Sequence, residues 1–186
     1  DPTESRGLGD VYKRQRLRRL RQSESIIDLT SECTLTKNDL IQPVFVKEGL
    51  NDKEPIESMP GIFRFGEDSV LKEIEEIEQL GIKAIAIFPV IDPSKKDSRG
   101  TEATKRDNFI SRVLNSIKSK FPDILVIADV ALDPYTDHGH DGVFEKDKIL
   151  NDQTLEVLAE QSLVLAEAGA DIIAPSDMMD GRIGFI

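Results

Sequence analysis

Two stretches of the sequence concentrate side chains whose types and spacing could do chemistry. The first, residues 129–142, reads DVALDPYTDHGHDG and holds four aspartates and two histidines within fourteen residues. The second, residues 174–182, reads APSDMMDGR and places Ser176 beside Asp177. Carboxylates at this density can transfer protons as general acids and bases or bind a hard cation such as Mg²⁺. The alternative is structural, because Asp-Pro, His-Gly and Asp-Gly pairs also form turns.

Four short apolar runs are the elements that must position these residues. They begin near residues 41, 84, 124 and 171. Segments with helical apolar spacing separate them: Val70–Leu80, Phe109–Ile117, and a segment from an Asn151 or Asp152 cap to Ala166. Apolar strands alternating with amphipathic helices are typical of an α/β fold with a parallel sheet. Both polar stretches follow strands, and the carboxyl ends of strands are where such folds build their active sites.

The strand–helix repeat fits either an open doubly wound sheet or a closed barrel. No G-x-G-x-x-G motif follows the first apolar run, which weakens the dinucleotide-binding open sheet. A (β/α)8 TIM barrel takes about 250 residues or more. If the fold is a barrel, the 186 residues would form only its first four β/α units.

Composition excludes several classes of function. Lys and Arg number 24 against 35 Asp and Glu, a net charge of −11, so nucleic acid and anionic membranes are not expected partners. No apolar run approaches the roughly 18 residues of a membrane helix. Cys33 is the only cysteine, which leaves no internal disulfide and no thiolate zinc site.

The N-terminal region differs from the rest of the chain in charge. Residues 1–22 hold seven basic and three acidic side chains. Residues 1–15 show no periodicity and are interpreted as a non-native or disordered leader. We expect residues 16–38 to form an arm that associates with the acidic body of a neighbouring copy, and residues 39–186 to form the half-barrel.

Several segments together strongly resemble the porphobilinogen synthase (5-aminolevulinate dehydratase) family over about residues 16–186. They are the two polar stretches above, with RLRRLR, DLIQPVFVKEG and SMPG nearer the N-terminus. The resemblance implies a TIM barrel whose N-terminal arm embraces a neighbour, commonly in a homo-octamer. It also implies a lyase that condenses two 5-aminolevulinate molecules to porphobilinogen, with loss of two waters, in haem and chlorophyll biosynthesis. The expected compartment is the cytoplasm, or the plastid of a photosynthetic eukaryote.

The resemblance assigns roles position by position. Asp129, Ser176 and Asp177 match catalytic residues that line the family's substrate cavity. The residues assigned to substrate binding are Asp133, Asp141 and Tyr135.

The metal expected from the resemblance is not zinc. Zinc-dependent members carry cysteines at three positions that are Ala131, Asp133 and Asp141 here. The two carboxylates do not suit zinc as thiolates do; they favour Mg²⁺, a monovalent cation such as K⁺, or no metal.

Other polar and sulfur-containing residues of the two stretches receive structural interpretations. His138 and His140 alternate along an extended segment and so point in opposite directions, which favours loop-bracing hydrogen bonds over shared metal ligation. Met178 and Met179 are expected to pack beneath the site. Arg182 could pair with a substrate carboxylate or form a structural ion pair.

The family's two Schiff-base lysines lie on strands beyond the fourth, and the sequence ends at Ile186. Lys47 is the only lysine placed to substitute, and we expect it to remain a solvated ammonium group instead. The 186-residue chain alone is therefore expected to be inactive and poorly stable. Two alternatives stay open: a metal-binding α/β protein using Asp129, Asp133 and Asp141 without Schiff-base chemistry, and a non-catalytic fragment that associates through its arm.

Overall fold

The computed structural model describes residues 16–186, so the predicted leader lies outside the described residues. The chain divides into two compact units, with the boundary between Thr36 and Lys37. This is within two residues of the predicted end of the arm. No helix in the described part of the chain is long and apolar enough to cross a membrane.

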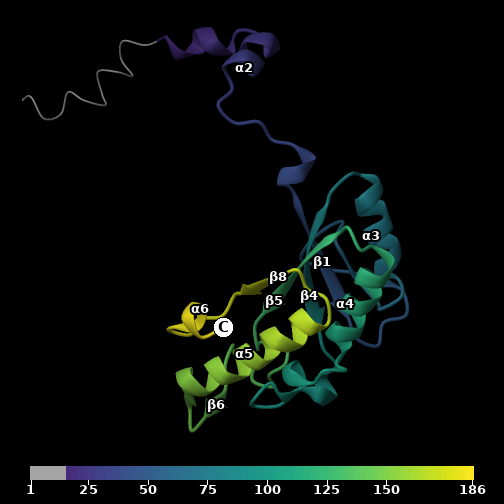
Figure 1. Cartoon of the computed structure of the whole chain (residues 1–186), viewed down its shortest axis with the longest axis vertical. Coiled ribbons are helices and arrows are strands. Elements are labelled where there is room, and N and C mark those ends of the chain that lie inside the picture. The colour runs from purple at the N-terminus through teal and green to yellow at the C-terminus, as the bar shows by residue number, and fades with distance from the viewer. Residues whose placement is uncertain (1–15) are drawn as a thin grey trace, which may run out of the picture. The chain divides into compact units, whose positions relative to one another are not determined.

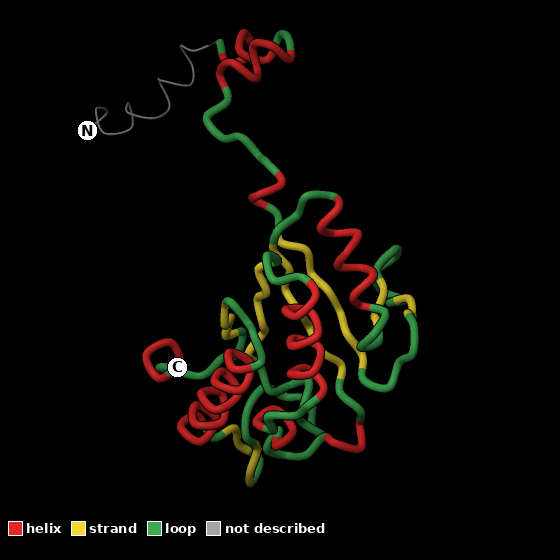
Figure 2. Tube along the Cα trace, turned by 45° about the vertical axis from the view of Figure 1, so that its right-hand side comes forward, coloured by secondary structure: helices red, strands yellow, loops and turns green. Residues whose placement is uncertain are grey.

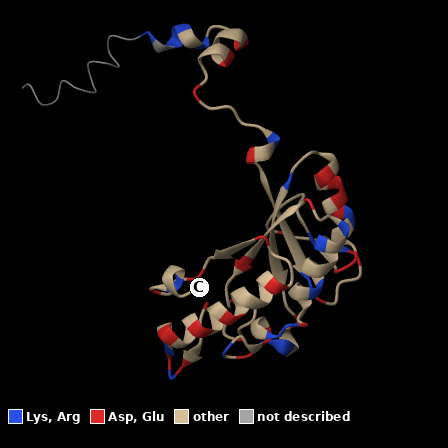
Figure 3. Ribbon diagram, in the orientation of Figure 1, with Lys and Arg blue, Asp and Glu red and all other residues tan. Residues whose placement is uncertain are grey.

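The first unit consists of a 3₁₀ helix, η1 (Leu17–Arg21), and a short helix, α2 (Glu24–Thr30). Ser23 caps α2, since its hydroxyl accepts a hydrogen bond from the Ile26 amide at 3.3 Å. The arginines of η1 form the basic end of this unit (Figure 3). None of the described side chains in residues 16–36 is buried, so this unit has no core of its own.

The second unit is built on a six-stranded sheet that contains the four predicted strands (Figure 1). These four are parallel neighbours and follow chain order across the sheet: β1 (Ile41–Lys47), β4 (Ala84–Val90), β5 (Leu125–Val130) and β8 (Ile172–Pro175). The three long helices, each between two of these strands along the chain, are α3 (Val70–Gln79), α4 (Phe109–Lys120) and α5 (Asn151–Glu167).

The order of the strands distinguishes a barrel from an open doubly wound sheet. A doubly wound sheet reverses its strand order and carries helices on both faces. Here β1, β4, β5 and β8 run without reversal, and the long helices cover one face (Figure 2). The second unit is therefore half of a (β/α)8 barrel.

The two faces of the sheet differ in burial. The helix-facing side chains form the core, and include Val44, Ile85 and Val126. On the opposite face, which is the interior of a complete barrel, Ile41, Leu125 and Ile172 are 53%, 37% and 43% exposed. The half-barrel thus presents an apolar strand face to solvent.

Two features of the sheet and helices differ from the expectations. The sheet has two strands beyond the four expected, since β3 (Phe63–Phe65) pairs with β1, and β2 (Lys53–Pro55) pairs with β3. Strands of three residues are too short to show periodicity. Asn151 or Asp152 was expected to cap α5, but both are helical residues and the cap position is Leu150.

The long polar loops contain short elements of their own. The loop after β4 forms two 3₁₀ helices, η3 (Pro93–Lys95) and η4 (Thr101–Thr104). The loop after β5 ends in a hairpin of β6 (Phe144–Glu145) and β7 (Lys148–Ile149). The remaining short elements are η2 (Lys37–Asp39) and α6 (Arg182–Phe185).

Candidate active site

Asp129 lies on β5 and faces the barrel interior. Successive side chains of a strand alternate between faces, and its neighbours Ala128 and Val130 are buried against the helices. Asp129 is in register with Ala174 of β8, so the hydroxyl of Ser176, just beyond β8, reaches its carboxylate and hydrogen-bonds to it. The structure thus brings together two of the three predicted catalytic residues.

Asp133 and Asp141 belong to the loop after β5 and complete a cluster of carboxylates with Asp129. Asp141 Oδ1 accepts a hydrogen bond from the Leu132 amide at 2.6 Å. Burial raises the pKa of Asp141 to about 6; the Leu132 hydrogen bond opposes the shift, and the charges of nearby aspartates add to it.

The other two carboxyl groups of this cluster are shifted in the same direction. Burial is the main cause that raises the pKa of Asp129, opposed by the Ser176 hydrogen bond and reinforced by the charge of Asp133. Partial desolvation raises the pKa of Asp133 at the exposed rim, while its own backbone amide and the charge of Lys96 oppose the shift. Groups with raised pKa values can exchange protons near neutral pH.

Asp177 does not share the exposed side of the loop with Ser176. Its side chain is fully buried, and Oδ2 lies 3.2 Å from Arg182 Nε. Oδ1 accepts a hydrogen bond from the Met179 amide at 2.7 Å. Adjacent residues in an extended segment point opposite ways, so Asp177 and Arg182 form a structural ion pair behind the loop.

Tyr135 is a core residue, and this position argues against its predicted contact with substrate. The residue is 1% exposed, and burial raises the pKa of its hydroxyl. Its side chain meets the Gln161 amide of α5, while its carbonyl accepts a hydrogen bond from the Asp97 amide at 3.3 Å. Tyr135 therefore anchors the loop after β5 to the core.

The loops after β4 and β5 are joined by hydrogen bonds that were not anticipated from the sequence. The Phe144 amide donates to the Ser98 carbonyl at 3.2 Å. His138 Nδ1 accepts from the His140 amide at 3.1 Å, and Nε2 lies 3.3 Å from the Ser98 carbonyl. The predicted loop-bracing role of His138 is confirmed. The prediction that His138 and His140 point in opposite directions is wrong, because their rings stack with centroids 5.7 Å apart.

The carboxylates after β5 offer hard oxygen ligands, which suit Mg²⁺ or K⁺ rather than zinc. The uncompensated charge of Asp129, Asp133 and Asp141 is a condition that a bound cation would relieve. Within residues 16–186, however, no three His, Cys, Asp or Glu side chains gather closely enough to hold a metal. Asp133 and Asp141 could thus supply only part of a coordination shell.

Three further residues have clear positions. Met179 is 3% exposed and packs in the core, as predicted, whereas Met178 is 62% exposed, so the prediction for Met178 is wrong.

Lys47 Nζ lies 2.8 Å from Glu54 Oε1 and from Oε2. This pairing occupies the only lysine that the sequence offered as a nucleophile.

Comparisons with known proteins agree with this geometry. The family model of "Delta-aminolevulinic acid dehydratase" matches residues 14–186. A delta-aminolevulinic acid dehydratase of Chlamydia pneumoniae is 46% identical over 172 residues, 92% of this chain and 52% of the relative. The enzyme of that name from Bradyrhizobium diazoefficiens is 49% identical over 171 residues, 92% of this chain and 48% of the relative. A chloroplastic relative from Selaginella martensii is 43% identical.

A solved structure extends the agreement to three dimensions. It is the delta-aminolevulinic acid dehydratase (porphobilinogen synthase) of Toxoplasma gondii in complex with the reaction product porphobilinogen. The TM-score is 0.87 at 42% identity, covering 91% of this chain and 48% of that chain. The chain spans about half the length of the relatives it matches, and it belongs to the delta-aminolevulinic acid dehydratase family.

Proposed function

We propose that the protein containing this chain condenses two molecules of 5-aminolevulinate to porphobilinogen with loss of two waters. The observation that carries the proposal is the Asp129–Ser176 pair, which lies on the interior face of a half-barrel of this family. Supporting it, the related structure from Toxoplasma gondii is a complex with porphobilinogen.

The proposed roles follow from burial and hydrogen bonding. Asp129 has a raised pKa, which suits a group that takes and returns protons during imine formation and dehydration. The Ser176 hydroxyl orients that carboxylate by donating to it. Asp177 and Arg182 hold the loop that carries Ser176, so we assign Asp177 a positioning role in place of direct contact with substrate.

Asp133 and Asp141 are proposed to bind substrate together with a cation, Mg²⁺ or K⁺. When bound, such an ion would neutralise the carboxylates and polarise a substrate oxygen. Zinc is not expected, because Ala131, Asp133 and Asp141 offer no thiolate.

Carbonyl capture requires a lysine amine, which forms an imine with the substrate ketone. Since Lys47 is paired with Glu54, we assign this role to lysines elsewhere in the complete protein. The 186-residue chain alone should therefore form no product.

None of the described side chains in residues 16–36 is buried, and we propose that the arm packs on another copy in a homo-oligomer, an octamer in the complete protein. We place the enzyme in the cytoplasm, or in the plastid of a photosynthetic source.

The test uses the complete protein that contains residues 16–186. A colour assay should show porphobilinogen made from 5-aminolevulinate alone. Borohydride reduction during turnover, followed by mass spectrometry, should place the trapped adduct on a lysine other than Lys47. The Lys47→Arg variant, which keeps the ion pair with Glu54, should still form the borohydride-trapped adduct. Absence of product would contradict the proposed function, and an adduct on Lys47 would contradict the assignment of the amine.

A further inference from the structure

Helix α5 contacts both loops of the candidate site through three polar side chains. Asn151, Thr154 and Gln161 fall within about 80° of one another around a helix that turns about 100° per residue. All three therefore lie on one face of α5, and each hydrogen-bonds to loop backbone that follows β5 or β8.

Thr154 and Gln161 hold the loop after β5 at its two ends. Gln161 Nε2 donates to the carbonyl of Ala131, the first residue after β5, at 3.1 Å. Thr154 Oγ1 accepts from the amide of Val143, two residues beyond Asp141, at 2.9 Å. Both side chains are completely buried, so these bonds are shielded from competing water.

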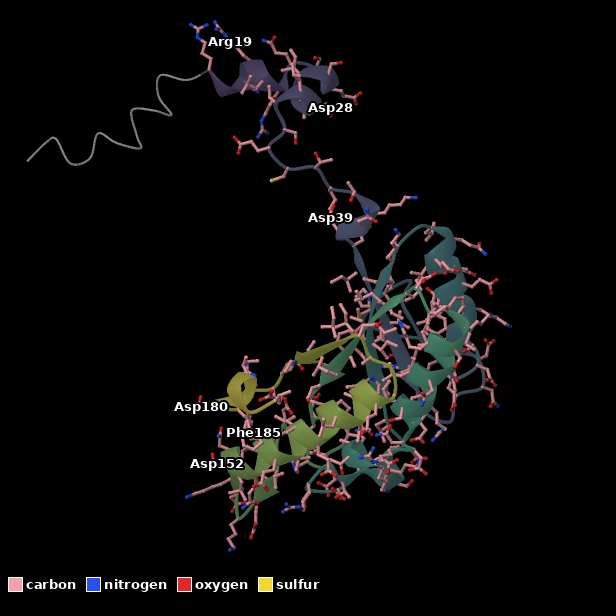
Figure 4. The ribbon with its side chains drawn as sticks, in the orientation of Figure 1. Arg19, Asp28, Asp39, Asp152, Asp180 and Phe185 are labelled. Carbon is pink, nitrogen blue, oxygen red and sulfur yellow. The ribbon has the colours of Figure 1, made fainter. Side chains whose placement is uncertain are left out.

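Asn151 holds the loop after β8. Its Oδ1 accepts from the Asp180 amide at 2.8 Å, and its Nδ2 donates to the Asp180 carbonyl at 3.2 Å. Asp180 ends the segment that begins with Ser176 and Asp177, and it lies close to the first turn of α5 at Asp152 (Figure 4). The amide of asparagine supplies an acceptor and a donor in one plane, which neither aspartate nor serine does.

The two loops also approach each other directly beside this contact. Gly142, next to Asp141, has a φ of +135°, and a Cβ there would lie 3.3 Å from Met179 Cε and 3.2 Å from Thr154 Oγ1. The spacing between the loops is thus fixed closely, and small displacements of reacting groups lower rates strongly.

We propose that Asn151 is a positioning residue for the reaction: by holding Asp180 on α5 it sets Ser176 against Asp129. The inference rests on the proposed function. α5 is then the element that holds the two catalytic loops in one geometry. Thr154 and Gln161 hold the loop after β5, and Asn151 holds the loop after β8.

Asn151→Asp in the complete protein separates positioning from stability. The aspartate keeps an acceptor for the Asp180 amide, loses the donor to the Asp180 carbonyl, and adds a negative charge that favours a helix N-terminus. We expect a melting temperature at or near that of the wild type, a KM within threefold, and a kcat lower by about 10-fold or more. The matched control is Asn115→Asp, at an exposed position of α4, which should change neither.

A double-mutant cycle identifies the group through which Asn151 acts. In a Ser176→Ala background, Asn151→Asp should lower kcat by less than threefold, because the misplaced hydroxyl is already absent. A full, multiplicative effect in that background would overturn the proposal. A kcat of the Asn151→Asp single variant within twofold of the wild type would also overturn the proposal. So would a loss of kcat matched by an equal loss of folded protein that borohydride can trap.

Hydrogen exchange gives a readout that does not depend on activity. In Asn151→Ala the Asp180 amide should exchange at least about 10-fold faster, while amides of β4 keep their protection. If the wild-type protein makes no porphobilinogen, the proposed function fails, and this measurement still decides the inference. Unchanged exchange at Asp180 would overturn it.

Discussion

Acidic residues lie near the carboxyl ends of all four main strands, but their electrostatic situations differ. Those near β1 and β4 are in the opposite situation to those near β5 and β8. On the β1–β4 side the acids are paired: Glu48 lies 2.5 Å from Lys95, Glu102 lies 2.6 Å from Lys105, and Glu54 lies 2.8 Å from Lys47. On the β5–β8 side Asp129, Asp133 and Asp141 form no ion pair with any residue in the described part of the chain.

The pKa directions express the same contrast. The pKa of Glu54 is lowered, chiefly by the hydrogen bond from Lys47. Burial raises the pKa values of Asp129, Asp133 and Asp141 instead. Paired charges hold the loop after β4 in place, whereas unpaired, partly buried carboxylates are unfavourable for folding and available for chemistry. We therefore expect the two clusters to have different roles, which neutralising one carboxylate in each should distinguish.

The largest effect is expected for Asp129→Asn in the complete protein. The amide retains the size of the side chain and its contact with Ser176 but cannot take a proton. Porphobilinogen formation should fall by about 10²-fold or more, with little change in melting temperature. Asp123→Asn, at an exposed position before β5, is the control and should be fully active. Equal rates of porphobilinogen formation for the two variants would contradict the proposed role of Asp129 in proton transfer.

On the paired side, Glu102→Gln should lower stability rather than catalysis. Glu102 is buried and accepts from Lys105, with Lys95 3.6 Å away. Losing a charge-assisted bond at a buried acceptor should reduce the free energy of unfolding by about 2 kcal/mol. Denaturant titration measures it.

The control for Glu102 is Glu75→Gln, which breaks an exposed pair with Lys120. Exposed pairs contribute about 0–1 kcal/mol. An equal decrease in the free energy of unfolding for both variants would contradict the expectation that burial makes the Glu102 pair stronger.

On the unpaired side, Asp141→Asn should raise stability at neutral pH. The folded pKa of about 6 exceeds the ordinary value of 3.8, so the folded state binds more protons and loses stability as pH rises from about 4 to 6. Asparagine keeps an acceptor for Leu132 without this loss. Thermal melts should show a gain of about 2 kcal/mol at pH 7.5 that largely disappears at pH 4. Asp137→Asn, an exposed residue of the same loop, should show no such gain. A gain independent of pH would refute the electrostatic explanation.

The smallest effect is expected from zinc removal. Because the unpaired cluster offers carboxylates and no thiolate, a zinc-selective chelator should leave the rate of porphobilinogen formation within about twofold. Full activity would sharpen the contrast by showing that the cluster does not depend on zinc. Strong loss that only Zn²⁺ restores would contradict the assignment of the metal.

The sequence alone determined the elements and the main pair of the site. Apolar runs and helical spacing are local patterns, and they located β1, β4, β5, β8 and the three long helices. Position at the ends of strands was enough to predict that the two polar stretches face one cavity, because parallel neighbours bring their carboxyl ends to one edge. The choice of Asp129 and Ser176 within those stretches came from the family resemblance. The absence of thiolates in the loop after β5 is also visible in the sequence.

Other features were decided only by tertiary structure, because they depend on partners far away in the chain. The resemblance assigned Tyr135 to substrate binding and Asp177 to catalysis, but in the structure Tyr135 is a buried core residue and the Asp177 carboxylate pairs with Arg182. Asn151 has the sequence signature of a helix cap, yet its amide hydrogen-bonds to Asp180, 29 residues away. A local pattern specifies which backbone a residue favours, whereas the bond its side chain makes depends on which segments the fold brings within reach.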